Sequence, residues 1–211
     1  MSTMPRIGDL APDFTANTTF GPLTLSEWQG GKWLLFFSHP ADFTPVCTTE
    51  LSELGRRNLE FESRNVKLIG LSVDSIHSHL AWMESIRDRM GVEVPFPMVA
   101  DLDTKVAQAY GMLHPGESQT LTVRAVFIID PTRTVRAMIY YPLSSGRNID
   151  ELIRLIDSLQ ASAANGVATP VNWHPGEKVI VPATTTMASR KARIADTTLE
   201  HITPYMALKT L

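Results

Sequence analysis

The single cysteine of the 211-residue chain, Cys47, lies where a helix is predicted to begin. Thr44 is a typical N-cap residue, and Pro45 suits the first helical position because it has no backbone N–H to leave unpaired. Cys47 then falls in the first helical turn, where free backbone N–H groups and the positive end of the helix dipole favour a thiolate over a thiol. The pattern points to a nucleophilic thiolate; the alternative is an inert, buried small hydrophobic residue.

The residues around this cysteine match a known signature. Pro40-x-x-x-Thr44-x-x-Cys47 resembles the active-site motif of the peroxiredoxins, and residues 38–50 are similar to the single-cysteine, peroxiredoxin-6-like subfamily. The similarity extends from residues 8–14 to the proline-rich C-terminal third. The resemblance implies a thiol-dependent peroxidase that reduces hydrogen peroxide and organic hydroperoxides. It also implies a cysteine sulfenic acid intermediate, recycling by an external thiol, and a role in antioxidant defence.

Two further residues are candidates for direct contact with a peroxide. The resemblance implies that the Thr44 hydroxyl hydrogen-bonds the peroxide and the thiolate, while the simpler role is a helix cap. Arg124 opens an apolar run, residues 126–129, where a charged side chain needs a partner. The resemblance identifies Arg124 with the family's arginine that faces the thiolate, where a guanidinium favours the thiolate and offers hydrogen bonds to the peroxide. The alternative is ordinary exposure at a strand end.

Four residues are assigned supporting or shielding roles. Pro40 is expected to cover the cysteine from water, unless it only shapes the loop. Glu50, one turn after Cys47, needs a cationic partner, and the resemblance suggests Arg147; the alternative is a solvated carboxylate. His39 precedes the loop proline, and none of the other histidines has metal-ligand spacing with it. We therefore expect no metal and no cofactor.

Strand-like and helical patterns alternate along the first 165 residues. Short strands are expected within residues 11–26, and buried strands at residues 32–38, 66–73, 97–101, 123–130 and 135–141. Helices are expected at residues 45–64, 75–90, 104–110 and 149–163. This alternation predicts an α/β fold with a mixed central sheet flanked by helices. The resemblance specifies a thioredoxin-like fold.

A change of composition at residues 165–170 predicts two parts, a peroxidase domain over residues 1–165 and a C-terminal extension over residues 166–211. So short an extension could hardly bury a stable core alone, so we expect it to pack on another surface. The resemblance implies a dimerisation arm over a partner subunit's active site. As an open sheet edge, residues 135–141 would promote aggregation. Pairing with the same strand of a second subunit would cover this edge. We expect a homodimer or an assembly of dimers.

Composition narrows the partners and the location. The net charge is −3, with charges of both signs interspersed, so the sequence shows no basic patch suited to binding nucleic acid. No basic amphipathic helix and no run of 18 apolar residues is present, so we expect no membrane association. The first nine residues lack the apolar core of a signal peptide, and a single cysteine suits the cytoplasm. The expected partners are a peroxide and an external reductant, either a small thiol or a thioredoxin- or glutaredoxin-type protein.

Two other functions compete with peroxide reduction. The first is acyl transfer, by a Cys–His hydrolase or by the phospholipase activity of some animal members of the subfamily. The stretch corresponding to the phospholipase serine, residues 30–33, reads Gly-Gly-Lys-Trp and contains no serine. The second is a non-enzymatic chaperone or redox-signalling role. Thiol-dependent consumption of peroxide that is lost in Cys47→Ser would exclude both.

Overall fold

The computed structural model describes residues 4–211, which form two compact units divided between Ile149 and Asp150. The sequence instead places its division after residue 165, where the composition changes. The difference is helix α6 (Ile149–Asn165), which belongs almost entirely to the second unit.

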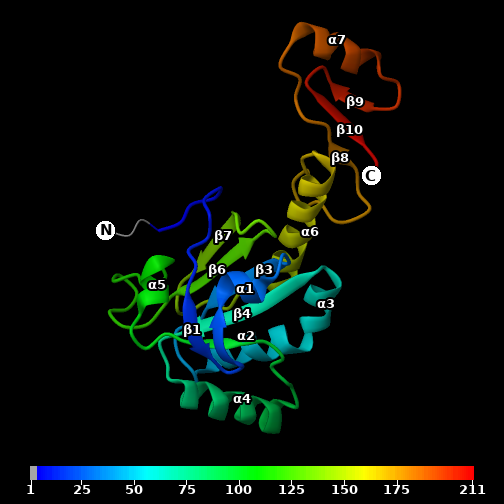
Figure 1. The fold of residues 1–211 in the computed structure, drawn as a ribbon. Helices are drawn as coiled ribbons and strands as arrows, with labels where there is room; N and C mark the ends of the chain where they lie inside the picture. Colours follow the sequence, from blue (N-terminus) through cyan, green and yellow to red (C-terminus); the bar gives the residue numbers. More distant parts are fainter. Residues whose placement is uncertain (1–3) are drawn as a thin grey trace. The chain divides into compact units, whose positions relative to one another are not determined.

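The first unit is built on a seven-stranded sheet in the order β2-β1-β5-β4-β3-β6-β7 (Figure 1). Its strands are β1 (Thr15–Thr18), β2 (Gly21–Thr24), β3 (Trp33–Ser38), β4 (Val66–Ser72), β5 (Met98–Ala100), β6 (Arg124–Ile129) and β7 (Val135–Tyr141). β3 pairs with β4 in parallel and with β6 in antiparallel orientation, so the sheet is mixed, as predicted. Every residue of β3 and β6 is buried, which requires cover on both faces of the sheet.

The helices of the first unit are α1 (Leu25–Gln29), α2 (Pro45–Arg56), α3 (Asn58–Ser63), α4 (Ile76–Met90) and α5 (Lys105–Ala109). The prediction of one helix over residues 45–64 is wrong in part, because α2 ends at Arg56 and α3 begins at Asn58. A Cβ at Gly55 would lie 2.5 Å from the Glu93 carbonyl oxygen, so packing selects glycine, a poor helix former, at the end of α2. α4 begins and ends as predicted, with Ser75 as its N-cap and Gly91 as its C-cap.

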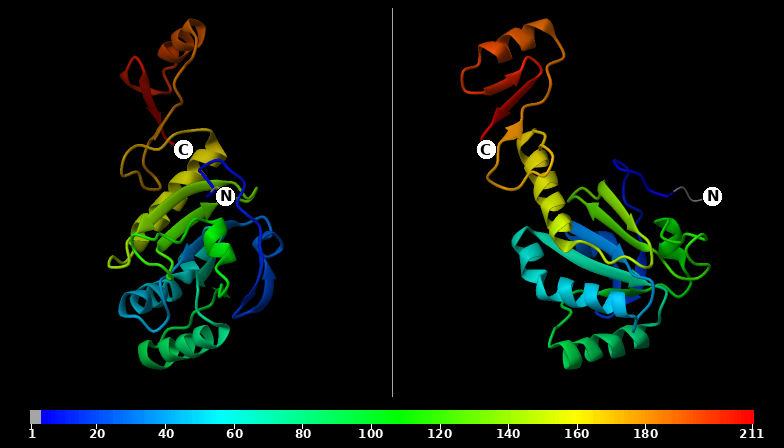
Figure 2. Two further views of the ribbon diagram at one scale, coloured as in Figure 1. Left: turned by 90° about the vertical axis from the view of Figure 1, so that its left-hand side faces the viewer. Right: turned by 180° about the vertical axis from the view of Figure 1, so that it is seen from behind.

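Helices α2 and α4 cover the same face of the sheet (Figure 2). The connections β3 to β4 and β4 to β5 both join parallel neighbours and step across the sheet in the same direction. Right-handed crossovers therefore place both helices on one side. The start of α2 thus lies at the carboxyl end of β3, with α4 beside it.

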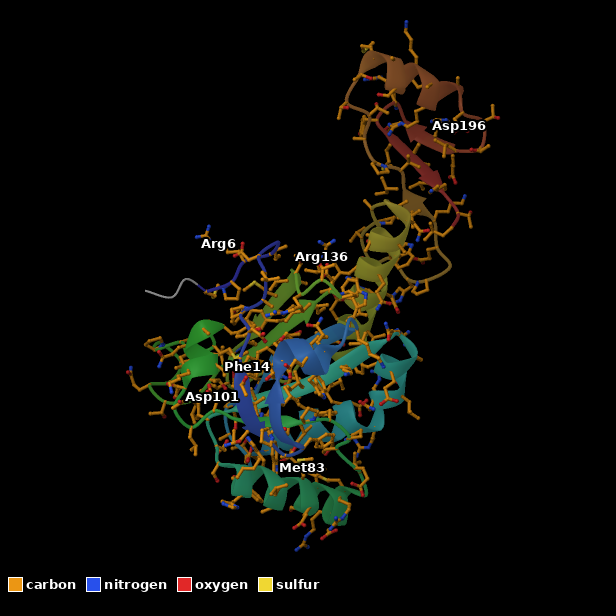
Figure 3. The ribbon with its side chains drawn as sticks, viewed as in Figure 1. Arg6, Phe14, Met83, Asp101, Arg136 and Asp196 are labelled. Carbon is orange, nitrogen blue, oxygen red and sulfur yellow. The ribbon has the colours of Figure 1, made fainter. Side chains whose placement is uncertain are left out.

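The opposite face carries an aromatic cluster. The Tyr110 ring lies edge-on to Phe36 of β3 and to Phe127 of β6, with centroid distances of 4.8 and 5.0 Å. Phe14, labelled in Figure 3, packs 5.6 Å from Phe36. Complete burial of such a side chain stabilises the fold by about 1.5–3 kcal/mol, so this cluster holds β3 and β6 firmly side by side.

The second unit contains most of α6, strand β8 (Val179–Ile180), helix α7 (Met187–Ala195) and the strands β9 (Glu200–Thr203) and β10 (Met206–Lys209). Its strands form an antiparallel sheet in the order β8-β10-β9. Val167, Trp173 and Val179 form a small core. The sequence patterns did not predict α7, β9 or β10.

Candidate active site

A loop of residues 39–44 joins the end of β3 to the start of α2. Thr44 occupies the N-cap position with an extended backbone, Pro45 is the first helical residue, and buried Cys47 lies in the first turn, as predicted. The capping bond of Thr44 was predicted wrongly. Its hydroxyl donates to the Ala41 carbonyl oxygen at 2.8 Å and makes no bond to the helix N–H groups. The hydroxyl oxygen can therefore still accept a hydrogen bond from another donor.

Pairing of β3 with β6 brings Arg124 to this loop. Because the two strands are antiparallel, β6 begins beside the end of β3. The Ser38 hydroxyl fixes the join, since it donates to the Val123 carbonyl at 2.6 Å and accepts from the Ala125 N–H at 3.1 Å. Arg124 is only 2% exposed, so the alternative of a solvated strand end is wrong. Its Nη1 donates to the Cys47 sulfur at 3.2 Å.

Glu50 is also buried and has two strong partners. Arg124 Nη1 lies 2.7 Å from Glu50 Oε2, and the Arg147 backbone N–H donates to Oε1 at 2.9 Å. The Arg147 guanidinium lies farther away, with Nη2 3.6 Å from Oε2. The solvated alternative is therefore wrong, and Arg124 is a closer ion-pair partner than the predicted Arg147. Nε and Nη2 of Arg124 both donate to the Leu143 carbonyl, which fixes the plane of the guanidinium.

We call Cys47, Glu50, Arg124 and Arg147 the arginine cluster. Burial lowers the pKa of Arg147, and the charge of Glu50 acts in the opposite direction. The Arg147 guanidinium lies 5.2 Å from the Phe37 ring and donates to the Ser38 carbonyl. With both guanidinium groups and the carboxylate ionised, the cluster has one excess positive charge without the sulfur. A thiolate at Cys47 would balance it, whereas a thiol would leave a buried charge uncompensated.

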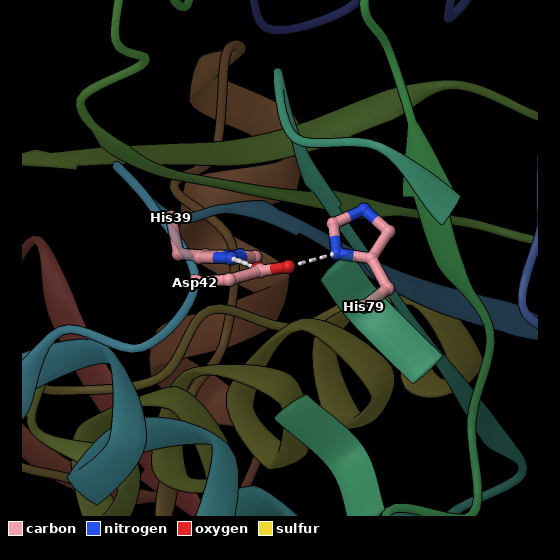
Figure 4. A group of neighbouring side chains, drawn as sticks. All are labelled: His39, Asp42 and His79. Atoms are coloured by element: carbon pink, nitrogen blue, oxygen red, sulfur yellow. Dashed lines mark hydrogen bonds and ion pairs between the residues drawn. The ribbon is translucent and has the colours of Figure 1, made fainter. Parts of the chain in front are cut away.

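Beside this cluster lies a second one, which sequence reasoning missed: His39, Asp42 and His79, which we call the histidine cluster (Figure 4). The Asp42 carboxylate bridges the two imidazoles, with Oδ1 2.8 Å from His39 Nε2 and Oδ2 2.8 Å from His79 Nδ1. All three residues are buried, and their ligand atoms lie within 4.8 Å of one another, which is the composition of a metal site. Sequence spacing gave His39 no such partners, because His79 comes from α4. The available signal in the sequence was helical spacing, which places His79 on the same face of α4 as the core residues Trp82 and Ile86.

The ionisation of the histidine cluster follows from its burial and hydrogen bonds. Burial alone would raise the pKa of Asp42, but hydrogen bonds from His39 and His79 hold that pKa well below its usual range. Burial lowers the pKa of His39, although Asp42 acts in the opposite direction. The cluster therefore contains an ionised Asp42 carboxylate, and folding favours the neutral form of His39.

Pro40 and Phe43 complete the loop of residues 39–44. Pro40 is buried, as a shielding residue must be, whereas the Phe43 side chain is exposed. The backbone of Phe43 has a φ of 56°, in the left-handed region that non-glycine residues rarely adopt. Such a conformation costs on the order of 1–3 kcal/mol, so the surrounding contacts must hold it in place.

Comparison with known proteins identifies the family of this fold and site. The model of the AhpC/TSA family matches residues 7–138, which include both clusters except Arg147. The chain belongs to the AhpC/TSA family of peroxiredoxins. A second model, the C-terminal domain of 1-Cys peroxiredoxin, matches residues 158–195. This peroxiredoxin therefore shares with the single-cysteine group its C-terminal domain and its possession of one cysteine.

Individual relatives agree. The peroxiredoxin of Aquifex aeolicus is 50% identical over 204 residues, which cover 92% of each chain. Peroxiredoxin 2 of Caldanaerobacter subterraneus is 53% identical and covers 90% of this chain and 86% of its own. Among solved structures, the yeast mitochondrial 1-Cys peroxiredoxin matches with a TM-score of 0.89 and 40% identity, covering 99% of this chain and all of its own. Peroxiredoxin 6 of Arenicola marina matches with a TM-score of 0.87 and 38% identity, covering 97% of each chain.

These relationships confirm the predicted thioredoxin-like fold and the predicted activity. The protein is a thiol-dependent peroxidase. Enzymes of this family reduce peroxides through a cysteine sulfenic acid, and an external thiol restores the cysteine.

Proposed function

We propose that Cys47 is the peroxidatic nucleophile, that Arg124 and Thr44 bind the peroxide, and that Pro40 shields the site. The observation that carries this proposal is the buried contact of Arg124 Nη1 with the Cys47 sulfur at 3.2 Å, beside the 2.7 Å ion pair to Glu50. A cation at this distance, together with the start of α2, stabilises a thiolate. Glu50 acts as a support because it fixes Arg124 and balances its charge. Arg147 in turn holds Glu50 through its backbone N–H and its guanidinium. His39 supports the loop of residues 39–44, which we call the peroxidatic loop.

The proposed chemistry is a two-electron transfer. The thiolate attacks one peroxide oxygen, so that an S–O bond forms as the O–O bond breaks. The other oxygen leaves as hydroxide or alkoxide and takes up a proton from water. Arg124 donates to the oxygen that gains charge, and the Thr44 hydroxyl oxygen accepts from the peroxide O–H. Donors that are already in place avoid the cost of reorganising water around the departing oxygen.

Recycling requires a thiol from outside the chain, because the sequence contains no second cysteine. The yeast mitochondrial relative is described as resolved through glutathione and thioredoxin systems. We infer the same classes of reductant here: a small thiol, or a thioredoxin- or glutaredoxin-type protein. One thiol attacks the sulfenic sulfur and releases water, and a second thiol cleaves the resulting mixed disulfide.

Peroxide titration followed by mass spectrometry tests this assignment. One equivalent of hydrogen peroxide should produce a dimedone-reactive Cys47 and no covalent dimer, and dithiothreitol should restore the thiol. A large excess should add two or three oxygens that dithiothreitol cannot remove. Steady-state turnover with glutathione, thioredoxin and dithiothreitol identifies the reductant, with Cys47→Ser as the inactive control. A quantitative disulfide between two Cys47 residues after one equivalent would contradict the proposed recycling.

We also propose a homodimer, or an assembly of dimers, in which β7 pairs with its twin. This strand lies at the edge of the seven-stranded sheet. Residues 8 and 9 already bond to the N–H and C=O of its first residue, Val135, so the edge proposed to pair with another strand begins after Val135. The second unit exposes several large apolar side chains, which suits a dimerisation arm. They are Val171, Met187, Ile194, Ile202 and Tyr205. Light scattering should give a dimer or larger, and truncation at Pro170 should weaken assembly or change peroxide kinetics; a micromolar monomer would contradict the proposal.

A cytoplasmic location completes the proposal. Its support is the single unpaired cysteine, which is the usage expected in a reducing compartment. None of the helices within residues 4–211 has the length and apolar character needed to cross a membrane. Fractionation of the producing cell should place the protein with cytoplasmic markers, and a periplasmic or organellar fraction would contradict it.

A further inference from the structure

The imidazole of His79 lies between two hydrogen-bond acceptors. Its Nδ1 is 2.8 Å from Asp42 Oδ2, and its Nε2 is 3.1 Å from the Val99 carbonyl oxygen. A neutral imidazole has a single N–H and can donate to only one of them. The carbonyl cannot donate, and the Asp42 carboxylate is held in its ionised form. Both bonds are satisfied together only when His79 carries both ring protons and is an imidazolium.

Asp42 is anchored by the buried His39 and His79 and by the half-buried Asp74. Its carboxylate accepts from His39 within the peroxidatic loop and from His79 on α4. Its backbone N–H donates to Asp74 Oδ2 at 3.0 Å, and that oxygen also accepts from the Ser72 hydroxyl at 2.7 Å. The titratable groups that face the histidine cluster are thus its own three members and Asp74. These contacts tie the loop to β4 and α4.

We propose that Asp42 and His79 form a buried ion pair that positions the peroxidatic loop for reaction with peroxide. The proposal rests on the roles assigned above to Pro40, Thr44 and Cys47. Asp42 directly precedes Phe43, whose left-handed backbone must be held in place, and Phe43 directly precedes Thr44. Among residues 4–211, no hydrogen bond or ion pair joins Asp42 or His79 to Cys47 or Arg124. Both are therefore positioning residues that act through the loop.

Two substitutions of His79 separate its two hydrogen bonds. The side-chain amide of asparagine places a donor near the Nδ1 position, so His79→Asn retains a bond toward Asp42. Glutamine places its amide near the Nε2 position, so His79→Gln retains the bond toward the Val99 carbonyl and loses the one to Asp42. The exposed His77 on the same helix provides the matched controls, His77→Asn and His77→Gln. The readouts are the second-order rate with hydrogen peroxide, the thiolate absorbance of Cys47, and the unfolding free energy.

We expect His79→Gln to react about ten- to a hundredfold more slowly, because small displacements of reacting groups have effects of that size. His79→Asn should stay within about threefold of wild type, by retaining the donor to Asp42. The thiolate absorbance should be unchanged in both variants, because the arginine cluster is intact. Asp42→Asn should react slowly like His79→Gln, and it provides a second test if His79→Gln does not fold.

Equal losses of rate in His79→Asn and His79→Gln would overturn the proposal. So would rate losses that simply parallel the decrease in unfolding free energy of each variant. Stoichiometric binding of Zn²⁺ alone to the Cys47→Ser chain, abolished by Asp42→Asn, would also overturn it, since an ion would then replace the proton between Asp42 and His79. A wild-type protein that does not react with peroxide would contradict the proposed function itself. A reactive wild type with unaffected His79 variants would contradict only this inference.

Discussion

The arginine cluster includes Cys47 and Glu50, which follow the loop of residues 39–44, and the histidine cluster includes His39 and Asp42 within that loop. Both clusters are buried, but they differ in what they contact. Arg124 of the arginine cluster donates directly to the Cys47 sulfur. Asp42 of the histidine cluster instead forms hydrogen bonds with His39 in the loop, with Asp74 after β4, and with His79 on α4. The arginine cluster has a positive charge that a thiolate would balance, whereas the charges of Asp42 and His79 in the proposed ion pair balance each other. The ionisation of the sulfur and the geometry of the loop are thus set by different residues, and should respond separately to substitution.

The largest effect is expected from removing the one carboxylate of the arginine cluster. Glu50→Gln leaves the buried Arg124 and Arg147 with a Cys47 thiolate as the one anion of their cluster, which should lower the unfolding free energy by about 3–5 kcal/mol. The fraction of Cys47 present as thiolate should rise, because the excess positive charge increases. Urea unfolding and thiolate absorbance measure the two effects. Glu53→Gln is the control, since its exposed pair with Arg56 is worth at most about 1 kcal/mol; equal destabilisation by both variants would contradict the assignment.

Arg124→Lys tests whether the cluster supplies only charge. Lysine keeps the positive charge but loses the planar group that reaches the sulfur, Glu50 and the Leu143 carbonyl together. The rate with peroxide should fall roughly ten- to a thousandfold, as for the loss of a preorganised donor. Stopped-flow kinetics provides the measurement. Thr44→Val should also be severe and Thr44→Ser mild, and an unchanged rate in Arg124→Lys would remove its proposed role.

The histidine cluster should make the fold sensitive to mild acid. Because burial lowers the pKa of His39, the unfolded chain binds more protons than the folded chain below about pH 6.5, the ordinary pKa of histidine. Stability should therefore fall as pH decreases from 6.5 to 5, by up to about 1.4 kcal/mol per pH unit. His39→Asn should flatten this slope, measured by urea unfolding at each pH. His77→Asn is the control, and a slope unchanged by His39→Asn would contradict the account.

The smallest effect separates helix stability from loop geometry. Ser75 caps α4 by accepting from the Ser78 N–H at 3.2 Å. Ser75→Ala should cost about 1 kcal/mol of unfolding free energy, the usual value of a cap, without changing the peroxide rate. Thermal unfolding and stopped-flow kinetics measure the two quantities. A rate loss as large as that of His79→Gln would mean that any weakening of α4 disturbs the site.

The sequence predicted the central elements because their patterns are local. The apolar run of β3, the caps at Ser75 and Gly91, and the Thr-Pro start of α2 each specify structure over a few residues. The second unit was largely missed for the opposite reason. α7 carries its capping box in a segment rich in threonine, and it is short, with only Met187 and Ile194 as large apolar residues. Its conformation depends instead on tertiary contacts such as those of buried Arg193, which donates to the Pro182 and Pro204 carbonyls.

The same distinction applies to the site. The sequence pointed to four candidate residues because a family motif and the residues around it resemble the peroxiredoxin pattern. They are Cys47, Thr44, Arg124 and Glu50. Asp42 and His79 were not found, since a contact between residues 37 positions apart has no local pattern. The primary partner of Glu50 could not be ranked either, because the choice between Arg124 and Arg147 depends on how β6 pairs with β3.

The most direct test of the account is the thiolate absorbance of Cys47 at neutral pH, measured in wild type and in Arg124→Met, with His79→Gln as the comparison. The account predicts a thiolate in wild type and in His79→Gln, and a thiol in Arg124→Met, because only the last removes the cation 3.2 Å from the sulfur. Equal thiolate absorbance in wild type and Arg124→Met would contradict the claim that the arginine cluster ionises the cysteine.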